Sequence, residues 1–540
     1  MQHLEAHVLS ELRHRYNAFA PIHRYQRLPP EVLLEILSQV EHTGRRDIRL
    51  MHVCQTWRSL LMGTPEFWAR MLAACPLRYS PQLVNQVPEW FDVFLHRSAP
   101  APLALTLPCF HQAMQNALMP HAYHIHSLAV CIAFKTTFDS LYTMLSHGLA
   151  SLASLCVTHD SNYPGKNDAS SYRALHWSDE TLPRLRTLRL PSIFLSPGFS
   201  VLSLRDVEIR SCDCYVCRNR SEKIVLDLPS FLKRCPFLDT LRLVGGGPLT
   251  LPHGSDSSVV LTALRVLHFG DHDVTEIREL ISRITVSPRT TVTIDVKYGY
   301  PGASVQVALQ SVPIFSMADK IVVRFCTGDF AAPFSLEAFQ EEALRLVIYA
   351  GRRRPVTTLT PSRDAITHGA LAGLALSLPS LSVTTLELWH IPSWVSLDEY
   401  FSLLKDAIAS LQRLAVLTLH LEDGIAFRPM RLFRRTCQGS PIVCPVLHTF
   451  EVSWSIPVDY ALNMFIASCA RLRNALNERS VVENPLEVFS LTCAHTRHLQ
   501  GPGRTGEAAV RKRLEKLFAG VAGEVQVTTY SRRDPTGQCP

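Results

Sequence analysis

Three cysteines in the stretch "SCDCYVCRNR" come nearest, by type and spacing, to a metal-binding site. Cys212, Cys214 and Cys217 lie within six residues, and thiolates so spaced can share a zinc ion, which takes four ligands at about 2.3 Å for sulfur. Cys235 or His176 would have to supply the fourth ligand, because the chain has no second Cys-x-x-Cys pair. The pattern favours an inserted loop over a zinc site, and a zinc-dependent binding protein is the alternative.

The other polar motifs do not assemble a catalytic site. In "HAYHIHSL", strand-like alternation places His124 and His126 on one face, but two imidazoles without a third ligand are more typical of surface or packed residues. The segment "VGGGPL" at residues 244–249 lacks the spacing and the Lys-Ser/Thr pair of a phosphate-binding loop. No GxSxG, HExxH or catalytic-cysteine signature occurs. We expect a protein that is not an enzyme and needs no cofactor.

Length and composition set the class of protein. With 540 residues, 47% of them hydrophobic and 19% charged, the chain is globular and exceeds the size of a single hydrophobic core, so several domains or a repeat array is expected. The net charge of +7 comes with short, scattered basic clusters, which argues against a nucleic-acid partner.

Cellular location follows from the cysteines and the apolar runs. The fifteen cysteines are odd in number and often lie in apolar runs, as buried thiols do in a reducing compartment. The N-terminus has charges throughout and lacks a secretory core. The longest apolar run, "GALAGLALSLPSL", is too short and too broken to span a bilayer. We expect cytoplasmic and/or nuclear localisation and no membrane association.

The first segment with a clear secondary-structure signal is "RLPPEVLLEILSQV", which is predicted to form a helix. Pro30 and Glu31 suit the first turn of a helix. Within that helix an apolar stripe predicts the core of a small module; it comprises Val32, Leu33, Ile36, Leu37 and Val40. Leu28, Pro29 and Leu34 lie off the stripe, and we expect them to contact another protein.

Further helices follow at residues 48–61 and from Thr64, a predicted N-cap followed by Pro65. Val53, Trp57 and Trp68 are predicted to hold the core. A module of about forty-five residues buries little surface, so an exposed apolar rim would gain from a partner.

These residues resemble an F-box at residues 26–71. The resemblance is carried by Leu-Pro-Pro-Glu at 28–31, the Leu/Ile run, Val53-Cys54 with Trp57, and Pro65 with Trp68. It extends to fungal, basidiomycete-type F-box proteins through a preceding helix at residues 4–16 and the segment at residues 90–107, which in that family leads into a leucine-rich repeat-like region. An ordinary helical subdomain is the alternative.

The resemblance implies a substrate receptor of an SCF-type cullin-RING ubiquitin ligase. Such a receptor binds a Skp-family adaptor, which links it to a cullin scaffold, and selects a protein target whose identity the sequence does not reveal. A scaffold without a role in degradation is the alternative. The adaptor-binding residues implied are Leu28, Pro29, Pro30, Glu31, Leu33, Leu34, Ile36, Leu37, Val53, Cys54, Trp57 and Leu60.

After residue 120 the chain returns repeatedly to apolar residues at i, i+3 and i+5, mostly at intervals of about 20 to 40 residues. The ten triplets are Ile125/Leu128/Val130, Leu152/Leu155/Val157, Leu185/Leu188/Leu190, Leu204/Val207/Ile209, Leu238/Leu241/Leu243, Leu264/Leu267/Phe269, Val383/Leu386/Leu388, Leu414/Leu417/Leu419, Leu447/Phe450/Val452 and Leu486/Phe489/Leu491. Further strands are predicted at residues 291–296, 320–325 and 344–350, and helices at residues 273–284, 397–411, 460–476 and 508–521.

Alternating strand and helix predict an α/β fold: an all-helical F-box followed by an irregular leucine-rich repeat-like solenoid of parallel strands with outer helices. The Asn typical of such repeats is missing, which puts the regularity of the turns in doubt, and a doubly wound α/β domain is the competing fold. The predicted domains are an N-terminal helix (1–25), the F-box (26–71), a linker or first non-canonical repeat (72–119), the repeat-like domain (120–530) and a flexible tail (531–540).

Overall fold

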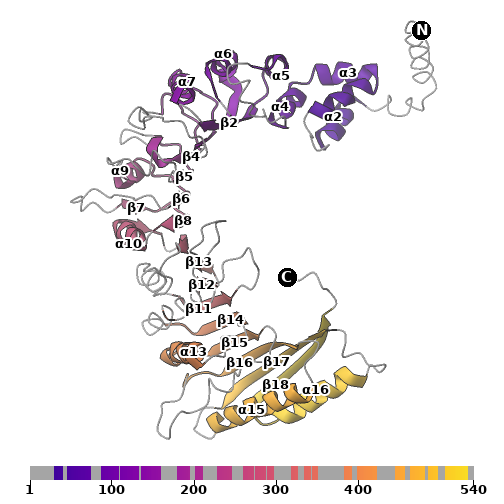
Figure 1. Cartoon of the computed structure of the whole chain (residues 1–540), viewed down its shortest axis with the longest axis vertical. Coiled ribbons are helices and arrows are strands. Elements are labelled where there is room, and N and C mark those ends of the chain that lie inside the picture. Colours follow the sequence, from indigo (N-terminus) through magenta and orange to yellow (C-terminus); the bar gives the residue numbers. More distant parts are fainter. Residues whose placement is uncertain are drawn as a thin grey trace, which may run out of the picture. The chain divides into compact units, whose positions relative to one another are not determined.

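The computed structural model describes residues 29–39, 45–74, 87–108, 110–132, 135–159, 179–194, 201–210, 228–245, 259–272, 274–287, 289–296, 318–325, 334–341, 343–350, 372, 382–391, 398–421, 444–456, 462–480, 485–496 and 505–532. The helix predicted at residues 4–16 lies outside these residues. The chain divides into an N-terminal unit, Met1–Leu238, and a C-terminal unit, Asp239–Pro540 (Figure 1).

Short helices open the N-terminal unit, as predicted. They are α2 (Pro30–Gln39), η2 (Arg45–His52), α3 (Gln55–Met62) and α4 (Pro65–Ala74). Cys54 caps α3, because its Sγ accepts a hydrogen bond from the Trp57 backbone N–H at 3.4 Å. The hydroxyl of Thr64, expected to cap α4, donates instead to the Leu60 carbonyl at 2.7 Å.

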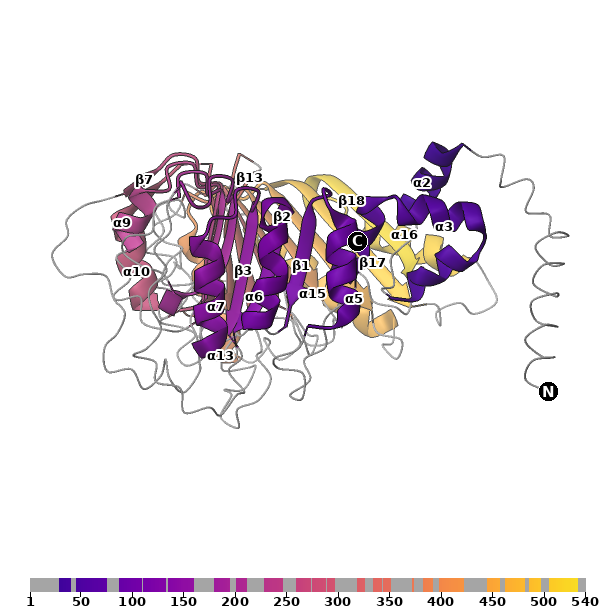
Figure 2. The same ribbon diagram turned by 90° about the horizontal axis from the view of Figure 1, so that it is seen from above.

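Parallel strands alternating with helices follow in the N-terminal unit. The strands are β1 (Leu103–Leu107), β2 (Ile125–Ile132), β3 (Ser154–His159), β4 (Thr187–Pro191) and β5 (Asp206–Arg210), and the helices are α5 (Glu89–Ser98), α6 (Gln112–Leu118), η4 (Met119–His124), α7 (Lys135–Ser146), η6 (Ser192–Phe194) and α9 (Leu228–Lys233). The strands lie side by side in chain order, and each pairs with the next in parallel. Helices α6 and α7 run alongside β1 to β3 (Figure 2).

The C-terminal unit continues the alternation of strand and helix. Its strands are β6 (Thr240–Val244), β7 (Val259–Leu261), β8 (Val266–His272), β9 (Ile284–Val286), β10 (Thr291–Val296), β11 (Lys320–Phe325), β12 (Phe334–Gln340), β13 (Ala343–Ala350), β14 (Thr385–Ile391), β15 (Val416–Leu421), β16 (Thr449–Ile456), β17 (Leu486–Thr496) and β18 (Ala522–Arg532). Its helices are α10 (Val274–Arg283), α13 (Asp398–Ser410), α15 (Leu462–Ser480) and α16 (Thr505–Phe518), which confirms the four helices predicted by periodicity.

One strand breaks the parallel order that the sequence predicts. In the C-terminal unit the order is β6-β8-β10-β13-β12-β11-β14-β15-β16-β17-β18, with β7 and β9 paired separately. Strand β12 is antiparallel to both β11 and β13, whereas the other pairs are parallel. The sequence did not reveal β12, because its buried positions include small Ser335 and Ala338 beside Leu336, which give a weak alternating signal.

The ten apolar triplets form the core of both units. Every one of their residues is at most 3% exposed. The helices cover this side of the strands: Phe518 of α16, for example, lies 4.6 Å from the Phe489 ring of β17. We call the opposite side of the strands, where the alternate residues point, the polar face.

A recurring turn leads into most of these strands and contains the first member of the triplet. Its backbone N–H donates to the carbonyl three residues earlier, as in Leu185 to Leu182, Leu238 to Cys235, Leu414 to Leu411 and Leu447 to Cys444. The two residues that follow donate together to one carbonyl of the preceding strand segment: the N–H groups of Arg186 and Thr187 both reach the Ala153 oxygen. The first apolar residue is therefore buried within the turn, as the triplet pattern predicts.

Among the described residues, no helix combines the length and apolar character needed to cross a bilayer.

Candidate functional site

Four large apolar side chains of the N-terminal helices are exposed. Val32 and Ile36 on α2 are 42% and 46% exposed, Val53 before α3 is 45% exposed, and Met62 at its end is 41% exposed. Val32 and Ile36 are four residues apart, so they share one face of α2. We call these four residues the N-terminal apolar surface. Adjoining exposed apolar side chains, such as Val32 and Ile36 on α2, are a feature of protein-docking sites.

The structure divides the apolar stripe predicted for α2. Leu33 and Leu37 are each 3% exposed and fill the core of the module, as predicted. The prediction that Val32 and Ile36 also lie in the core is wrong. A ten-residue helix in a module this small has neighbours on only part of its circumference. Of the four stripe residues within α2, two therefore pack in the core and two remain at the surface; Val40 lies outside the described residues.

The remaining residues that the resemblance assigned to adaptor binding differ in exposure. Those at the start of α2 are exposed, namely Pro29, Pro30 and Glu31. Those that are half-buried are Leu34, Cys54, Trp57 and Leu60. Leu28 lies outside the described residues. Val53, predicted to hold the core, is exposed instead, because it precedes the first turn of α3 rather than lying on its inner face.

Helix α4 joins the N-terminal helices to the first strand. Phe67 and Trp68 are 1% and 2% exposed, and α4 packs against both α5 and β1. The Trp68 ring lies 5.0 Å from that of Phe94 on α5, and the Arg97 guanidinium lies 4.7 Å above it. The core role predicted for Trp68 is confirmed, and it extends beyond the helical module to the strands.

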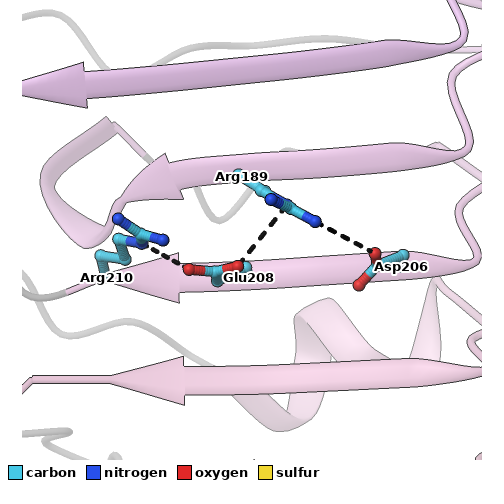
Figure 3. Close-up of polar contacts among 4 residues, drawn as sticks. All are labelled: Arg189, Asp206, Glu208 and Arg210. Atoms are coloured by element: carbon cyan, nitrogen blue, oxygen red, sulfur yellow. Dashed lines mark hydrogen bonds and ion pairs between the residues drawn. The ribbon is translucent and has the colours of Figure 1, made fainter. Parts of the chain in front are cut away.

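Four charged residues form an ion-pair network on the polar face of the N-terminal unit (Figure 3). Arg189 on β4 reaches across to β5, where its Nε lies 3.5 Å from Glu208 and its Nη2 lies 3.9 Å from Asp206. Arg210 pairs with the other oxygen of Glu208. The Glu208 side chain is only 7% exposed, whereas those of Arg189 and Arg210 are 43% and 52% exposed, so the two arginines cover a buried carboxylate.

Replacing Glu208 with Gln should lower the free energy of unfolding by about 2 kcal/mol, because two arginines lose their shared anion and one partner of a buried pair is removed; partial exposure of the arginines keeps the loss below that of a fully buried pair. Chemical denaturation measures it. The matched control is Glu279→Gln, whose partner Arg283 lies 3.0 Å away on the same helix and whose side chain is 45% exposed; it should change stability by less than about 0.5 kcal/mol.

A second polar cluster lies on the polar face of the C-terminal unit. Trp389 on β14 stacks against His420, with ring centres 3.5 Å apart, and the Arg324 guanidinium lies over the Trp389 ring at 5.0 Å from its centre. Burial acts to raise the pKa of the Glu387 carboxyl, but hydrogen bonds from Lys320 and Trp389 lower it below its usual value. Tryptophan and arginine are the residues most often found at the energetic centres of protein interfaces.

The zinc hypothesis gains no ligand from the described residues. Cys212, Cys214, Cys217 and His176 lie outside them. Cys235, the other possible fourth ligand, is fully buried, and burial raises the pKa of its thiol to about 12. Within the described ranges, no group of three or more His, Cys, Asp or Glu residues is placed to hold a metal ion.

The histidine motif is part of the packing. His124 lies in η4 rather than on the strand expected from alternation, is 5% exposed, and its Nδ1 hydrogen-bonds to the Ala101 carbonyl at 2.7 Å. His121 lies 3.3 Å from the other ring nitrogen of His124, and burial, followed by the neighbouring His124, lowers the pKa of His121. His126 is exposed on β2. The prediction that His124 and His126 share a strand face is therefore wrong.

Comparison with protein families addresses the helices that carry the N-terminal apolar surface. Residues 25–73 match the family model F-box-like. The chain carries an F-box-like domain. The match begins and ends within two residues of the boundaries 26–71 expected from the resemblance, and it includes α2, η2, α3 and all of α4 but its last residue. No curated protein matches the chain. All four residues of the N-terminal apolar surface thus belong to the F-box-like domain.

Proposed function

We propose that the protein is a substrate receptor of an SCF-type cullin-RING ubiquitin ligase, and that it has no active site of its own. The F-box-like domain binds a Skp-family adaptor, which connects it to a cullin scaffold, and the strand-rich remainder binds a protein target. The observation that carries the proposal is the F-box-like domain with exposed Val32, Ile36, Val53 and Met62. In this proposal Leu33 and Leu37 act indirectly, by holding α2 in place.

The strand-rich remainder is proposed to be an irregular leucine-rich repeat-like solenoid of fungal type. Three features support this: strands that follow one another in chain order through β1 to β5 and β14 to β18, helices on the triplet side, and a recurring turn before the strands. A doubly wound domain would instead reverse its strand order at one central point and continue outward from it on both sides, whereas chain order here resumes at β14 after the local reversal β13-β12-β11. Regular repeats link neighbouring turns through an Asn, which this chain lacks. We propose that the carbonyls that accept two backbone N–H groups, such as that of Ala153, provide this link instead.

We place the target on the polar face. The side chains there are held by their neighbours, as Arg324 is by Glu337 at 3.4 Å and Trp389 Nε1 is by Glu387 at 3.2 Å. Pre-organised side chains lose little conformational entropy on binding. A broad face with aromatic and charged groups suits a folded protein better than a small ligand.

Affinity purification of the tagged full-length chain tests the proposal. A Skp-family adaptor and a cullin should co-purify, and the purified complex should transfer ubiquitin to at least one co-purifying protein. Absence of the adaptor would contradict the assignment. Adaptor binding without ubiquitin transfer to any bound protein would favour the scaffold alternative instead.

A further inference from the structure

The first and last strands in the strand order, β1 and β18, differ in what lies against them. Strand β1, five residues long, is packed against α4 of the F-box-like domain. Strand β18 is eleven residues long and stands last in the strand order, so no described strand pairs with its outer edge. An unpaired edge presents a row of backbone N–H and C=O groups that are ready to bind another strand.

Strand β18 lacks the two residue types that most often protect such an edge. Its sequence, AGEVQVTTYSR, contains neither Lys nor Pro, although these are the residues most often used to block edge pairing. Its pairing with β17 proceeds residue by residue from Glu524 to Arg532 without a bulge. The strand is rich in β-branched residues, which favour strand pairing. The edge is therefore long and regular, and no described strand pairs with it.

The charges of β18 are complementary to those of a second copy of the same strand. Glu524 and Arg532 are its only charged residues, and they lie at equal distances in sequence from Thr528. An antiparallel pair of β18 strands centred on Thr528 places each Glu524 opposite an Arg532 and no two like charges opposite each other. A register centred on Glu524 would place two carboxylates together and is disfavoured.

We propose that the outer edge of β18 is a homodimerisation site, at which two copies of the chain pair antiparallel about a two-fold axis through Thr528. Antiparallel pairing satisfies the two-fold symmetry of a closed dimer. With the axis perpendicular to the plane of the strands, the helix-covered sides of both copies lie on the same side of the joined sheet. Val527, which is 4% exposed on that side of β18, would then bring the cores of the two copies next to each other. This inference is independent of the proposed ubiquitin-ligase role.

Charged substitutions at Thr528 test the proposal, because this exposed residue would lie opposite Thr528 of the second copy. The mass of the full-length chain, measured by light scattering during size-exclusion chromatography, should be that of a dimer. Thr528→Lys and Thr528→Glu should each weaken the dimer at least about tenfold by placing like charges opposite each other, and an equimolar mixture of the two should restore the dimer mass. Thr143→Lys, at an exposed position of α7, is the matched control and should remain dimeric.

Three results would overturn the proposal: a wild-type chain that is monomeric at every concentration, variants that remain dimeric, or two folded monomeric variants that do not associate when mixed. Circular dichroism checks that each variant is folded. If Thr528→Lys does not fold, Thr528→Arg replaces it and, mixed with Thr528→Glu, should likewise restore the dimer mass.

Discussion

The double variant Ile36→Asp, Val53→Asp is expected to lose the Skp-family adaptor in affinity purification, while the rest of the chain stays folded. Both side chains are nearly half exposed, at 46% and 45%, so aspartate is tolerated in the free protein. In the complex each aliphatic side chain would bury the exposed half of its surface, a contribution of about 0.7 to 1.4 kcal/mol. Losing both, and burying two carboxylates in their place, should weaken binding at least about a hundredfold.

The matched control replaces two exposed valines of the C-terminal unit. Val260 and Val446 are 63% and 51% exposed, so Val260→Asp, Val446→Asp introduces the same charge without touching the F-box-like domain. This control should bind the adaptor as the wild type does. Surface plasmon resonance with purified adaptor measures both. Adaptor binding within about threefold of wild type by the Ile36/Val53 variant would contradict the placement of the docking surface.

Replacing Trp68 with Ala should destabilise both the F-box-like domain and the adjoining strand. The side chain is 2% exposed and contacts Phe67, Phe94 and Arg97. Truncating a buried tryptophan costs about 3 to 5 kcal/mol, from lost burial and the cavity left behind. Because α4 packs on both α5 and β1, amide hydrogen exchange should accelerate at residues 103–107 as well as at residues 65–74.

Trp57→Ala is the control for this variant. Trp57 belongs to the same domain but is only half-buried, so its truncation should cost clearly less and should leave exchange at residues 103–107 unchanged. Undiminished protection of β1 in the Trp68→Ala chain would show that α4 does not link the domain to the strands.

The F-box-like domain could be predicted from the sequence because its signals are local. Pro30 and Glu31 mark the start of a helix, and the Leu/Ile spacing gives its period. The same spacing did not reveal which apolar residues of α2 face the core. Leu33 and Val32 are adjacent and chemically similar, yet they are 3% and 42% exposed, because the neighbouring helices cover one part of the circumference of α2 and leave another free.

The repeat positions were predictable for the same reason. The first member of a triplet is buried in a turn and the next two alternate along a strand, so the pattern repeats in sequence as it does in space. Strand β12 was not predictable, since its direction depends on the strands on either side of it. Sequence periodicity reports which side of a strand is buried but does not report its neighbours.

The sequence by itself determined the helical F-box-like domain, the buried triplets and the alternation of strand with helix, because each depends on contacts between residues close in the chain. Only the tertiary structure decided which apolar residues of "RLPPEVLLEIL" remain exposed, that Arg189 and Arg210 share the buried Glu208, and that β18 ends the strand order. Each of these depends on residues brought together across separate elements, and no spacing along the chain encodes that proximity.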